Sequence, residues 1–373
     1  MINITISGDF APTKVFLDSV EKLDGNYFAE LNAILGNSDL NITNLECPII
    51  NESSPSDKYG PSLATDIRAI DLLKAGRFQA VSLANNHIMD HGSKGLSSTI
   101  ASLNDQGIKY FGAGNNVDEA NQPFIFQKDG KKIGILNFAE NEFSNTVDSN
   151  PGAAALDLIN NSAAIRNLKK EVDFLIVIIH GGAELHEYPS PRFKKTLRFM
   201  ADQGANVVVA HHTHRYNGYE VYNGVPLFFG LGNFVFPNQS LKDEKWSLGV
   251  LLDLKIQIDN SVTFETIPFL QNYHDFNFIL LSENQLSTFR KDEEQMNEII
   301  QNDSALNAKY EVFFKKVEDQ YLHYLQPYTS KYFHKLYSLG LLPSFLKNKT
   351  KKLLYLNLIR CEAHRDIVLK ILK

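Results

Sequence analysis

Side chains that can bind a metal ion recur directly after the predicted strands of this sequence. They are Asp9, Asn44, Glu46, Asn85, Asn86, His87, Asp90, His180, Glu184, His211, His212 and His214. In open α/β sheets, ligands bind in the crevice beyond the carboxyl ends of the strands. Because five separate strand ends deliver Asp, Glu, Asn or His, the sequence predicts one shared site at that edge.

The types of donor indicate which metal and which chemistry to expect. Carboxylate, amide and imidazole groups together suit a divalent ion such as Mn, Fe, Zn or Mg. The two cysteines, Cys47 and Cys361, form no CxxC pair, so a thiolate-bound structural zinc is not expected. A bound divalent ion lowers the pKa of water and neutralises charge on a phosphoryl group. A nearby imidazole can then protonate the leaving oxygen.

Most of these residues also have an explanation without a metal when each is taken alone. The alternatives are an N-cap for Asp9, a solvated position for Glu46, Glu184 and His186, a turn for Asn85 and Asn86, and packing for His87. His212 and His214 are harder to explain in this way, because two imidazoles one residue apart after an apolar strand are typical of ligands. The set as a whole favours a metal site.

The elements that must position these residues follow from the hydrophobic periodicity. Strands are expected at 2–7, 39–45, 78–84, 123–128, 132–138, 172–179, 205–210, 217–222, 225–230, 246–256 and 262–269. Helices are expected at 26–36, 65–75, 93–106, 160–171 and 191–203. Asn223-Gly224 predicts a hairpin turn between two of the strands. Alternating strands and helices followed by hairpins predict a mixed α/β sandwich.

The character of the chain changes near residue 280. Glycine becomes rare, and helical spacing covers 285–302, 305–325 and 349–372. We therefore predict a domain of residues 1–280 followed by a helical, basic extension of residues 281–373. The net charge of −6 over 373 residues argues against a general nucleic-acid binder. Residues 326–373 nevertheless carry ten Lys or Arg against two acidic residues.

The N-terminus shows no basic region followed by a long apolar run, so a signal peptide is not expected. No window of about 18 apolar residues predicts a transmembrane helix. These features favour a cytoplasmic location, with a peripheral position on the inner face of the membrane as an alternative.

Several stretches, taken in order, resemble the CapA family of capsule and poly-gamma-glutamate biosynthesis proteins. They span residues 4 to about 236 and read ISGDF, TNLECPI, SLANNHIMDHG, FGAG, IIHGGAELHEYPSP and GANVVVAHHTHRYNGYEVYNGVPLFFGLGNFVF. This family is related to the calcineurin-like metallophosphoesterases. The resemblance implies a four-layer αββα sandwich of two mixed β-sheets, here with a C-terminal helical extension.

The resemblance also implies a site for one or two divalent ions and a role for each motif residue. The implied ligands are Asp9, Glu46, Asn86, His180, His212 and His214. The implied general acid is His87, oriented by Asp90. We assign four further motif residues to substrate binding, namely Asn85, Glu184, His186 and Asn233. Where the phosphoesterases have Asp-x-His, this chain has Asp9-Phe10-Ala11, which leaves one metal position with fewer ligands.

The leading interpretation is a metal-dependent hydrolase, of the phosphoesterase type, in the synthesis or modification of a capsule or surface polysaccharide. Its substrate would be a phosphorylated or polyanionic glycan or polymer, and no nucleic-acid partner is expected. One alternative is a metal-containing scaffold that binds an anionic polymer or a synthase partner without hydrolysis. Another is hydrolysis of an amide in polyglutamate, since metal-activated water also attacks carbonyls.

The end of the chain allows two interpretations. The stretch SFLKNKTKKLLYLNLIR (344–360) mixes Lys and Arg with Leu, Phe and Tyr. Such a basic amphipathic segment within residues 326–373 is typical of contact with an anionic membrane surface or a polyanionic polymer. The alternative, which we slightly favour from the sequence, is a helix that packs on the catalytic domain with its lysines in solvent.

Overall fold

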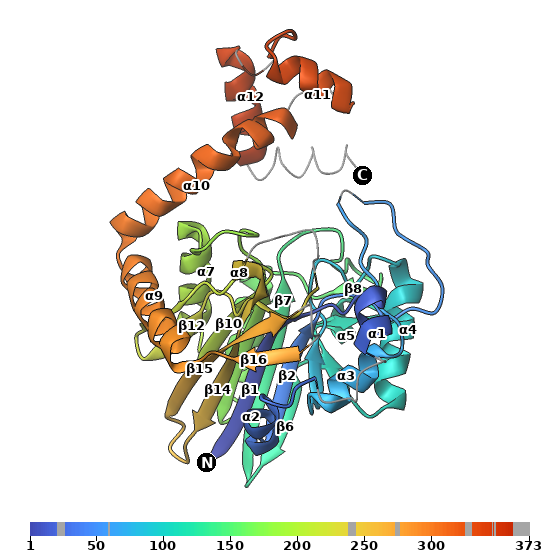
Figure 1. Ribbon diagram of the computed structural model, residues 1–373, viewed down its shortest axis with the longest axis vertical. Helices are drawn as coiled ribbons and strands as arrows, with labels where there is room; N and C mark the ends of the chain where they lie inside the picture. The colour runs from blue at the N-terminus through green and yellow to red at the C-terminus, as the bar shows by residue number, and fades with distance from the viewer. Residues whose placement is uncertain are drawn as a thin grey trace. The chain divides into compact units, whose positions relative to one another are not determined.

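The structure is a computed structural model of the 373-residue chain (Figure 1). It describes residues 1–20, 27–58, 60–237, 244–272, 277–324, 330–344, 346 and 348–360. The chain forms two compact units, Met1–Asn307 and Ala308–Lys373. The first unit therefore extends past residue 280 and includes the helix α9 (Glu283–Gln301), which the sequence analysis assigned to the extension.

Two β-sheets form the centre of the first unit. The larger sheet has the order β16-β15-β14-β1-β2-β3-β4, with β13 paired to β1. Its strands are β1 (Ile2–Phe10), β2 (Leu40–Leu45), β3 (Ala80–Ser82), β4 (Lys109–Phe111), β13 (Asn233–Val235), β14 (Leu248–Ile256), β15 (Val262–Asn272) and β16 (Asn277–Leu280). Its strands β1 to β4 run parallel, whereas β14 to β16 pair antiparallel.

The smaller sheet has the order β11-β12-β10-β9-β7-β6. Its strands are β6 (Phe124–Lys128), β7 (Lys131–Ala139), β9 (Phe174–His180), β10 (Val207–His211), β11 (Tyr219–Tyr222) and β12 (Val225–Phe228). Strands β7, β9, β10 and β12 are parallel, and the two outer strands are antiparallel. A short separate pair joins β5 (Ala113–Gly114) and β8 (Gly152–Ala153).

Helices flank the two sheets (Figure 1). In the first unit they are α1 (Lys14–Val20), α2 (Asn32–Asn37), α3 (Ala69–Ala75), α4 (Gly92–Asp105), α5 (Val117–Ala120), α6 (Leu158–Leu168), α7 (Pro191–Asp202), α8 (Glu244–Ser247) and α9. Helix α10 (Asp303–Tyr324) crosses the boundary, and α11 (Lys331–Ser338) and α12 (Lys349–Arg360) follow. The predicted α/β class with two mixed sheets between helices is confirmed. None of the helices in the described ranges is long and apolar enough to cross a bilayer.

Alternation along the strands decides which side chains reach the space between the sheets. On β9, Phe174, Ile176 and Ile178 belong to the apolar core shared by the two sheets. The next residue on that face is His180, which closes the strand. The same alternation on β10 leads to His211, which is the register partner of His180. The inter-sheet core therefore ends in imidazoles at the carboxyl ends of β9 and β10.

Two local predictions have clear outcomes. The hairpin at Asn223-Gly224 is confirmed, because Tyr222 pairs with Val225 and both turn residues have positive φ. The first strand is longer than expected and includes Asp9, which pairs with Asn44 on one side. Pairing with β13 on the other side extends β1 past the Gly8 position at which the sequence pattern ends.

Helix α9 is held to the first unit by a buried polar cluster. The carboxylate of Glu293 accepts hydrogen bonds from the hydroxyls of Tyr216 and Thr266 and from the guanidinium of Arg290. Beyond its C-terminal end, the buried ammonium of Lys194 donates to Asp303. These bonds explain why the first unit continues to Asn307.

Candidate metal centre

The ends of β1 and β2 deliver two buried carboxylates. Asp9 is held in place by Nδ2 of Asn44, which donates to its Oδ1 at 2.8 Å, and by the backbone N–H of His212, which donates to its Oδ2 at 3.2 Å. Glu46 follows β2 directly, and its backbone N–H donates to the carbonyl of Phe10 at 2.9 Å. Parallel pairing of β1 and β2 thus places both acids at one edge of the sheet.

The ends of β9 and β10 deliver three imidazoles. His180 closes β9, and the chain leaves β10 through His212 and His214, whose φ angles are 92° and 55°. Positive φ is costly for a residue with a side chain, and such strain gathers at functional sites. The two left-handed residues turn the backbone so that His212 approaches His180 and His214 approaches Asp9.

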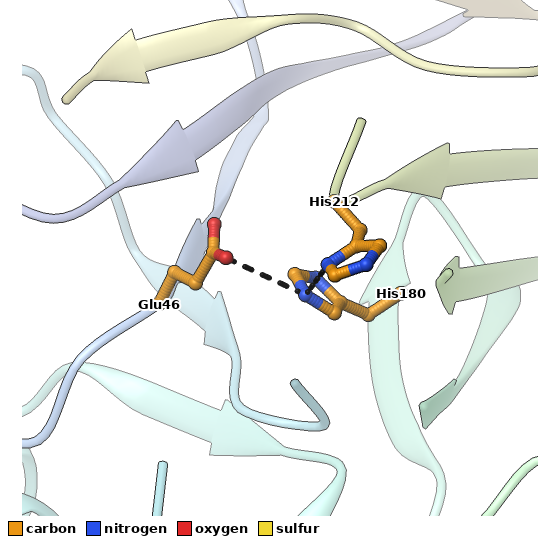
Figure 2. Close-up of side chains that lie close together, drawn as sticks. All are labelled: Glu46, His180 and His212. Atoms are coloured by element: carbon orange, nitrogen blue, oxygen red, sulfur yellow. Dashed lines mark hydrogen bonds and ion pairs between the residues drawn. The ribbon is translucent and has the colours of Figure 1, made fainter. Parts of the chain in front are cut away.

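These side chains form two ligand groups that share one residue. Glu46, His180 and His212 make the first group, and Asp9, Glu46 and His214 make the second, with the donor atoms of each group within 4.8 Å of one another. Figure 2 shows the first group, with Oε1 of Glu46 3.5 Å from Nε2 of His180. Nδ1 of His212 lies 3.0 Å from the same His180 nitrogen. Glu46 is therefore the one residue that belongs to both groups.

Asn86 adds an amide oxygen to the first group. Asn86 lies on the loop that follows β3, and its Oδ1 is 2.9 Å from Nε2 of His180. All six residues that the resemblance implies as ligands thus come together at one edge of the sandwich. With Asn86, the first group offers four possible ligand side chains and the second offers three.

The state of Glu46 shows that a cation fits this centre. The carboxylate is fully buried, and neither of its oxygens has a hydrogen-bond partner. Burial and the neighbouring charge of Asp9 raise the pKa of Glu46 well above its usual range. A buried carboxylate without a hydrogen bond costs free energy that a bound cation would remove. The carboxylate, amide and imidazole donors match the preferences of Mn, Fe, Zn or Mg.

The imidazoles of the first group are in the form that binds metals. Burial lowers the pKa of His180 and of His212, so both are neutral near pH 7. Burial also opposes the charged form of His214, but contact with Asp9 outweighs it and raises the pKa of His214. Burial alone would raise the pKa of Asp9, yet the contact with His214 and the nearby imidazoles lower it well below its usual range.

A second polar cluster adjoins the ligands. Nδ1 of His87 lies 2.6 Å from Oδ2 of Asp90, so the predicted pairing of the two residues is present. The ammonium of Lys58 donates to Oδ1 of Asp90 and lies 3.3 Å from Nδ1 of His87. Its side chain is 6% exposed, which is rare for a lysine and indicates a specific role.

Sequence reasoning missed Lys58 because it belongs to a polar, Pro- and Ser-containing stretch, which predicted an ordinary surface loop. In the structure this loop is bound to the segment that carries His87. The backbone N–H of Leu63 donates to Asp90 at 2.6 Å, and the N–H of Ser54 donates to the imidazole of His91 at 2.9 Å. No motif or spacing in the sequence pointed to this contact.

The four residues assigned to substrate binding lie in different settings. Glu184 is exposed at the rim, with Oε1 3.9 Å from Nε2 of His212, and Glu142, which the sequence analysis did not select, lies at 3.8 Å. Asn233 is buried, and its Oδ1 lies 3.0 Å from Nδ1 of His214. Such a contact orients a ligand imidazole. The role of these residues in substrate binding stays a prediction.

The remaining two predicted substrate residues are buried. The side chain of Asn85 donates to the carbonyl of Leu45 at 2.8 Å and accepts from the N–H of His87 at 3.1 Å, so it braces the loop after β3. His186 lies outside both ligand groups, and its carbonyl accepts from Nδ2 of Asn217 at 2.7 Å.

The buried imidazoles predict how the stability of the metal-free protein depends on pH. Burial lowers the pKa of His180, His211 and His212, so below about pH 6.5 these three imidazoles bind protons in the unfolded chain but not in the folded chain. The raised pKa values of Glu46 and His214 act in the opposite direction at higher pH, and below about pH 6.5 only Glu46 still opposes the three imidazoles. We therefore expect the midpoint temperature of thermal unfolding, measured in EDTA, to fall as the pH is lowered below about 6.5.

The variant His211→Leu is a matched control for this prediction. Neither ring nitrogen of His211 has a hydrogen-bond partner, and its Nδ1 lies 3.8 Å from Oδ1 of Asp9, so leucine removes a titrating group without breaking a hydrogen bond. Its midpoint should change less with pH than that of the wild type. An equal pH dependence in the two proteins would contradict the assignment, as would a wild-type midpoint that rises as the pH is lowered below about 6.5.

Comparison with known proteins identifies the family. A family model described as bacterial capsule synthesis protein PGA_cap matches residues 3–238, well over half of the chain. The chain belongs to this family. The resemblance inferred from motifs between residue 4 and about residue 236 is thereby confirmed.

Curated relatives in this family share about a quarter to a third of their matched residues with this chain. The capsule biosynthesis protein CapA of Bacillus anthracis is 27% identical over 280 residues, covering 72% of this chain and 67% of that protein. The PGA biosynthesis protein CapA of Bacillus subtilis (strain 168) is 30% identical over 249 residues, covering 65% and 64%. A probable polyglutamine synthesis accessory protein of Mycobacterium tuberculosis is 27% identical over 223 residues, covering 56% and 59%. The match spans about two thirds or less of each relative.

Solved structures show more distant similarity. A hypothetical protein from Thermus thermophilus has 16% identity and a TM-score of 0.47, covering 72% of this chain and 99% of that chain. The 5'-nucleotidase from Candida albicans has 11% identity and a TM-score of 0.42, covering 85% and 57%. The fold assignment rests on the strand order and packing described above.

Proposed function

We propose that this PGA_cap family protein is a metal-dependent hydrolase that cleaves phosphoester bonds in the synthesis or modification of an anionic capsule or surface polymer. The observation that carries the proposal is the pair of ligand groups that share the buried Glu46, whose carboxylate has no hydrogen-bond partner. Beside them, Lys58, Asp90 and His87 form a cluster suited to proton transfer. A ligand centre and an adjacent proton donor are together what phosphoester cleavage requires.

The residues of the chain have separate roles in this proposal. Glu46, Asn86, His180 and His212 would hold one divalent ion, and Asp9, Glu46 and His214 a second. When bound, such ions neutralise phosphoryl charge and acidify water. His87 would protonate the leaving oxygen from Nε2, because its Nδ1 faces Asp90 at 2.6 Å. Asp90 and Lys58 would hold the ring in that orientation.

The number of metal ligands predicts that the two groups bind their ions with unequal affinity. The first group offers four metal ligands from the chain and the second offers three. The carboxylate of Glu46 is counted in both groups. We expect one ion to remain after dialysis and a second to bind more weakly in a titration. Elemental analysis of protein purified without added metal, followed by calorimetric titration, measures both.

The names of the relatives support the proposed substrate class. The relatives are named for capsule and PGA biosynthesis, so the polymer acted on or modified is expected to be anionic. The acidic rim at Glu142 and Glu184 would repel such a polymer in the absence of ions. Bound cations would reverse this local charge.

The proposal is tested by hydrolysis assays on metal-loaded protein. The substrates are p-nitrophenyl phosphate, bis(p-nitrophenyl) phosphate, a phosphorylated glycan and poly-gamma-glutamate, each assayed with Mn, Fe, Zn and Mg. Metal-dependent release of nitrophenol or phosphate supports the proposal. Cleavage of poly-gamma-glutamate alone would identify an amide hydrolase instead. Stoichiometric metal without turnover on any substrate would favour a non-hydrolytic scaffold.

A further inference from the structure

The second compact unit carries a long stretch without acidic residues. Between Asp319 and Glu362 the sequence contains seven Lys or Arg and no Asp or Glu. Charge of one sign over such a length is repelled by itself and attracted to a polyanion or an anionic surface. Of these seven, Lys331 and Lys335 lie on α11, and Lys349, Lys351, Lys352 and Arg360 lie on α12.

Helix α11 presents apolar side chains to solvent. None of its residues is buried, and Tyr332 is 72% exposed. Tyr332, Leu336 and Leu339 are spaced by four and three residues, so they lie along one face of the helix and its C-terminal end. Lys331 and Lys335 flank this row.

Helix α12 repeats the arrangement. Leu353, Leu356 and Ile359 are about half exposed and are spaced by three residues, so they too share a face. Lys349 and Lys352 lie on the same side of the helix by their spacing, and both are exposed. Leu341, between the two helices, is 67% exposed. Exposed large apolar residues that share a helix face are typical of an interaction surface.

We propose that α11, α12 and the segment between them form a surface that binds an anionic lipid bilayer. The lysines complement the charge of acidic headgroups, and the Tyr and Leu side chains enter the interface between headgroups and acyl chains. A soluble polyanion would satisfy the lysines but would leave the leucines in water. The combination of both residue types therefore favours a membrane surface over a polymer. The inference is independent of the catalytic proposal.

The lysines and the leucines should each contribute to membrane binding. A lysine near an anionic surface strengthens binding about five-fold, so reversing three charges should lower the partition coefficient on the order of 100-fold or more. Removing three leucines should lower it by about ten-fold or more, because their burial in the interface is lost. Salt should weaken the binding, because it screens the lysines.

The test is sedimentation of the complete chain with vesicles of phosphatidylcholine, with and without phosphatidylserine. One variant reverses charge at Lys335, Lys349 and Lys352, each to Glu. A matched control reverses the same number of charges on the first unit, at Lys94, Lys109 and Lys132, which are exposed. A third variant replaces Leu339, Leu353 and Leu356 by Ser. Circular dichroism establishes that each variant is folded.

The expected result is binding of the wild type and of the control to vesicles that contain phosphatidylserine, and loss of binding in the other two variants. Failure of the wild type to sediment with anionic vesicles would overturn the proposal. The proposal would also be overturned if the variant with Glu at Lys335, Lys349 and Lys352 bound the vesicles as well as its control. Binding to soluble polyglutamate that the leucine variant retains in full would identify a polymer-binding surface instead.

Discussion

Replacement of Glu46 by Gln is expected to remove metal from both ligand groups and, with it, all metal-dependent hydrolysis. Glu46 is the residue that the two groups share, so its loss takes a ligand from each. Loss of a partner outside the ligand shell already lowers metal affinity about 10–100-fold, so loss of the bridging ligand should exceed about 100-fold. Elemental analysis and calorimetric titration measure the change.

The stability of the Glu46→Gln variant separates this effect from misfolding. Its amide replaces a buried carboxylate that has no hydrogen-bond partner, so the metal-free variant should be at least as stable as the metal-free wild type. The matched control is Glu119→Gln, at an exposed glutamate of α5. Wild-type metal content and turnover in Glu46→Gln would refute the assigned centre.

Replacement of His87 by Gln should instead abolish fast turnover while the metal stays bound. His87 belongs to neither ligand group, and general-acid catalysis typically contributes about 10²–10⁴-fold to the rate. We expect kcat to fall by about that factor with metal content unchanged. The defect should be smaller for a p-nitrophenyl ester than for a methyl ester, because nitrophenolate leaves without needing a proton.

Lys58 offers a second test of the same cluster. The Lys58→Met change removes the ammonium that donates to Asp90 and should lower kcat in the same direction but less than His87→Gln. Lys58→Arg keeps a donor and should retain more activity. In a chain that already carries His87→Gln, Lys58→Met should have little further effect, because residues that act as a unit are not additive. An undiminished effect in that double variant would place Lys58 outside the cluster.

The contrast between Glu46 and His87 tests the division of the site into two parts. A metal-binding defect in His87→Gln would move His87 into the ligand shell. Retained metal in Glu46→Gln would mean that the carboxylate supplies negative charge to the site but does not coordinate the ion. The two variants thus examine different steps of the same proposal.

Much of the fold was predictable from local pattern. The Asn223-Gly224 turn and the strong apolar runs that became β9 and β10 follow from rules that involve only neighbouring residues. The end of β1 was predicted too early, because Asp9 is drawn into the strand by pairing with β2 and β13, which lie far away in sequence. Pairing partners of that kind leave no local signal.

The candidate ligands were predictable for a different reason. Asp9, Glu46 and His180 each stand at the end of a strand, and the parallel strands of each sheet end at a common edge. The spacing of His212 and His214 pointed to a metal by itself. Sequence reasoning could not show that Glu46 is shared by two groups, because that depends on distances between side chains from both sheets.

By itself, the sequence determined the main strands and helices, the types of ligand side chain and the family resemblance. The tertiary structure decided which donors meet, because the crossovers of the chain bring β1 and β2 of one sheet to the same edge as β9 and β10 of the other. It also brought Lys58 to Asp90, since a loop of irregular backbone has a path that is set by the surfaces it covers and not by any periodicity of its own residues.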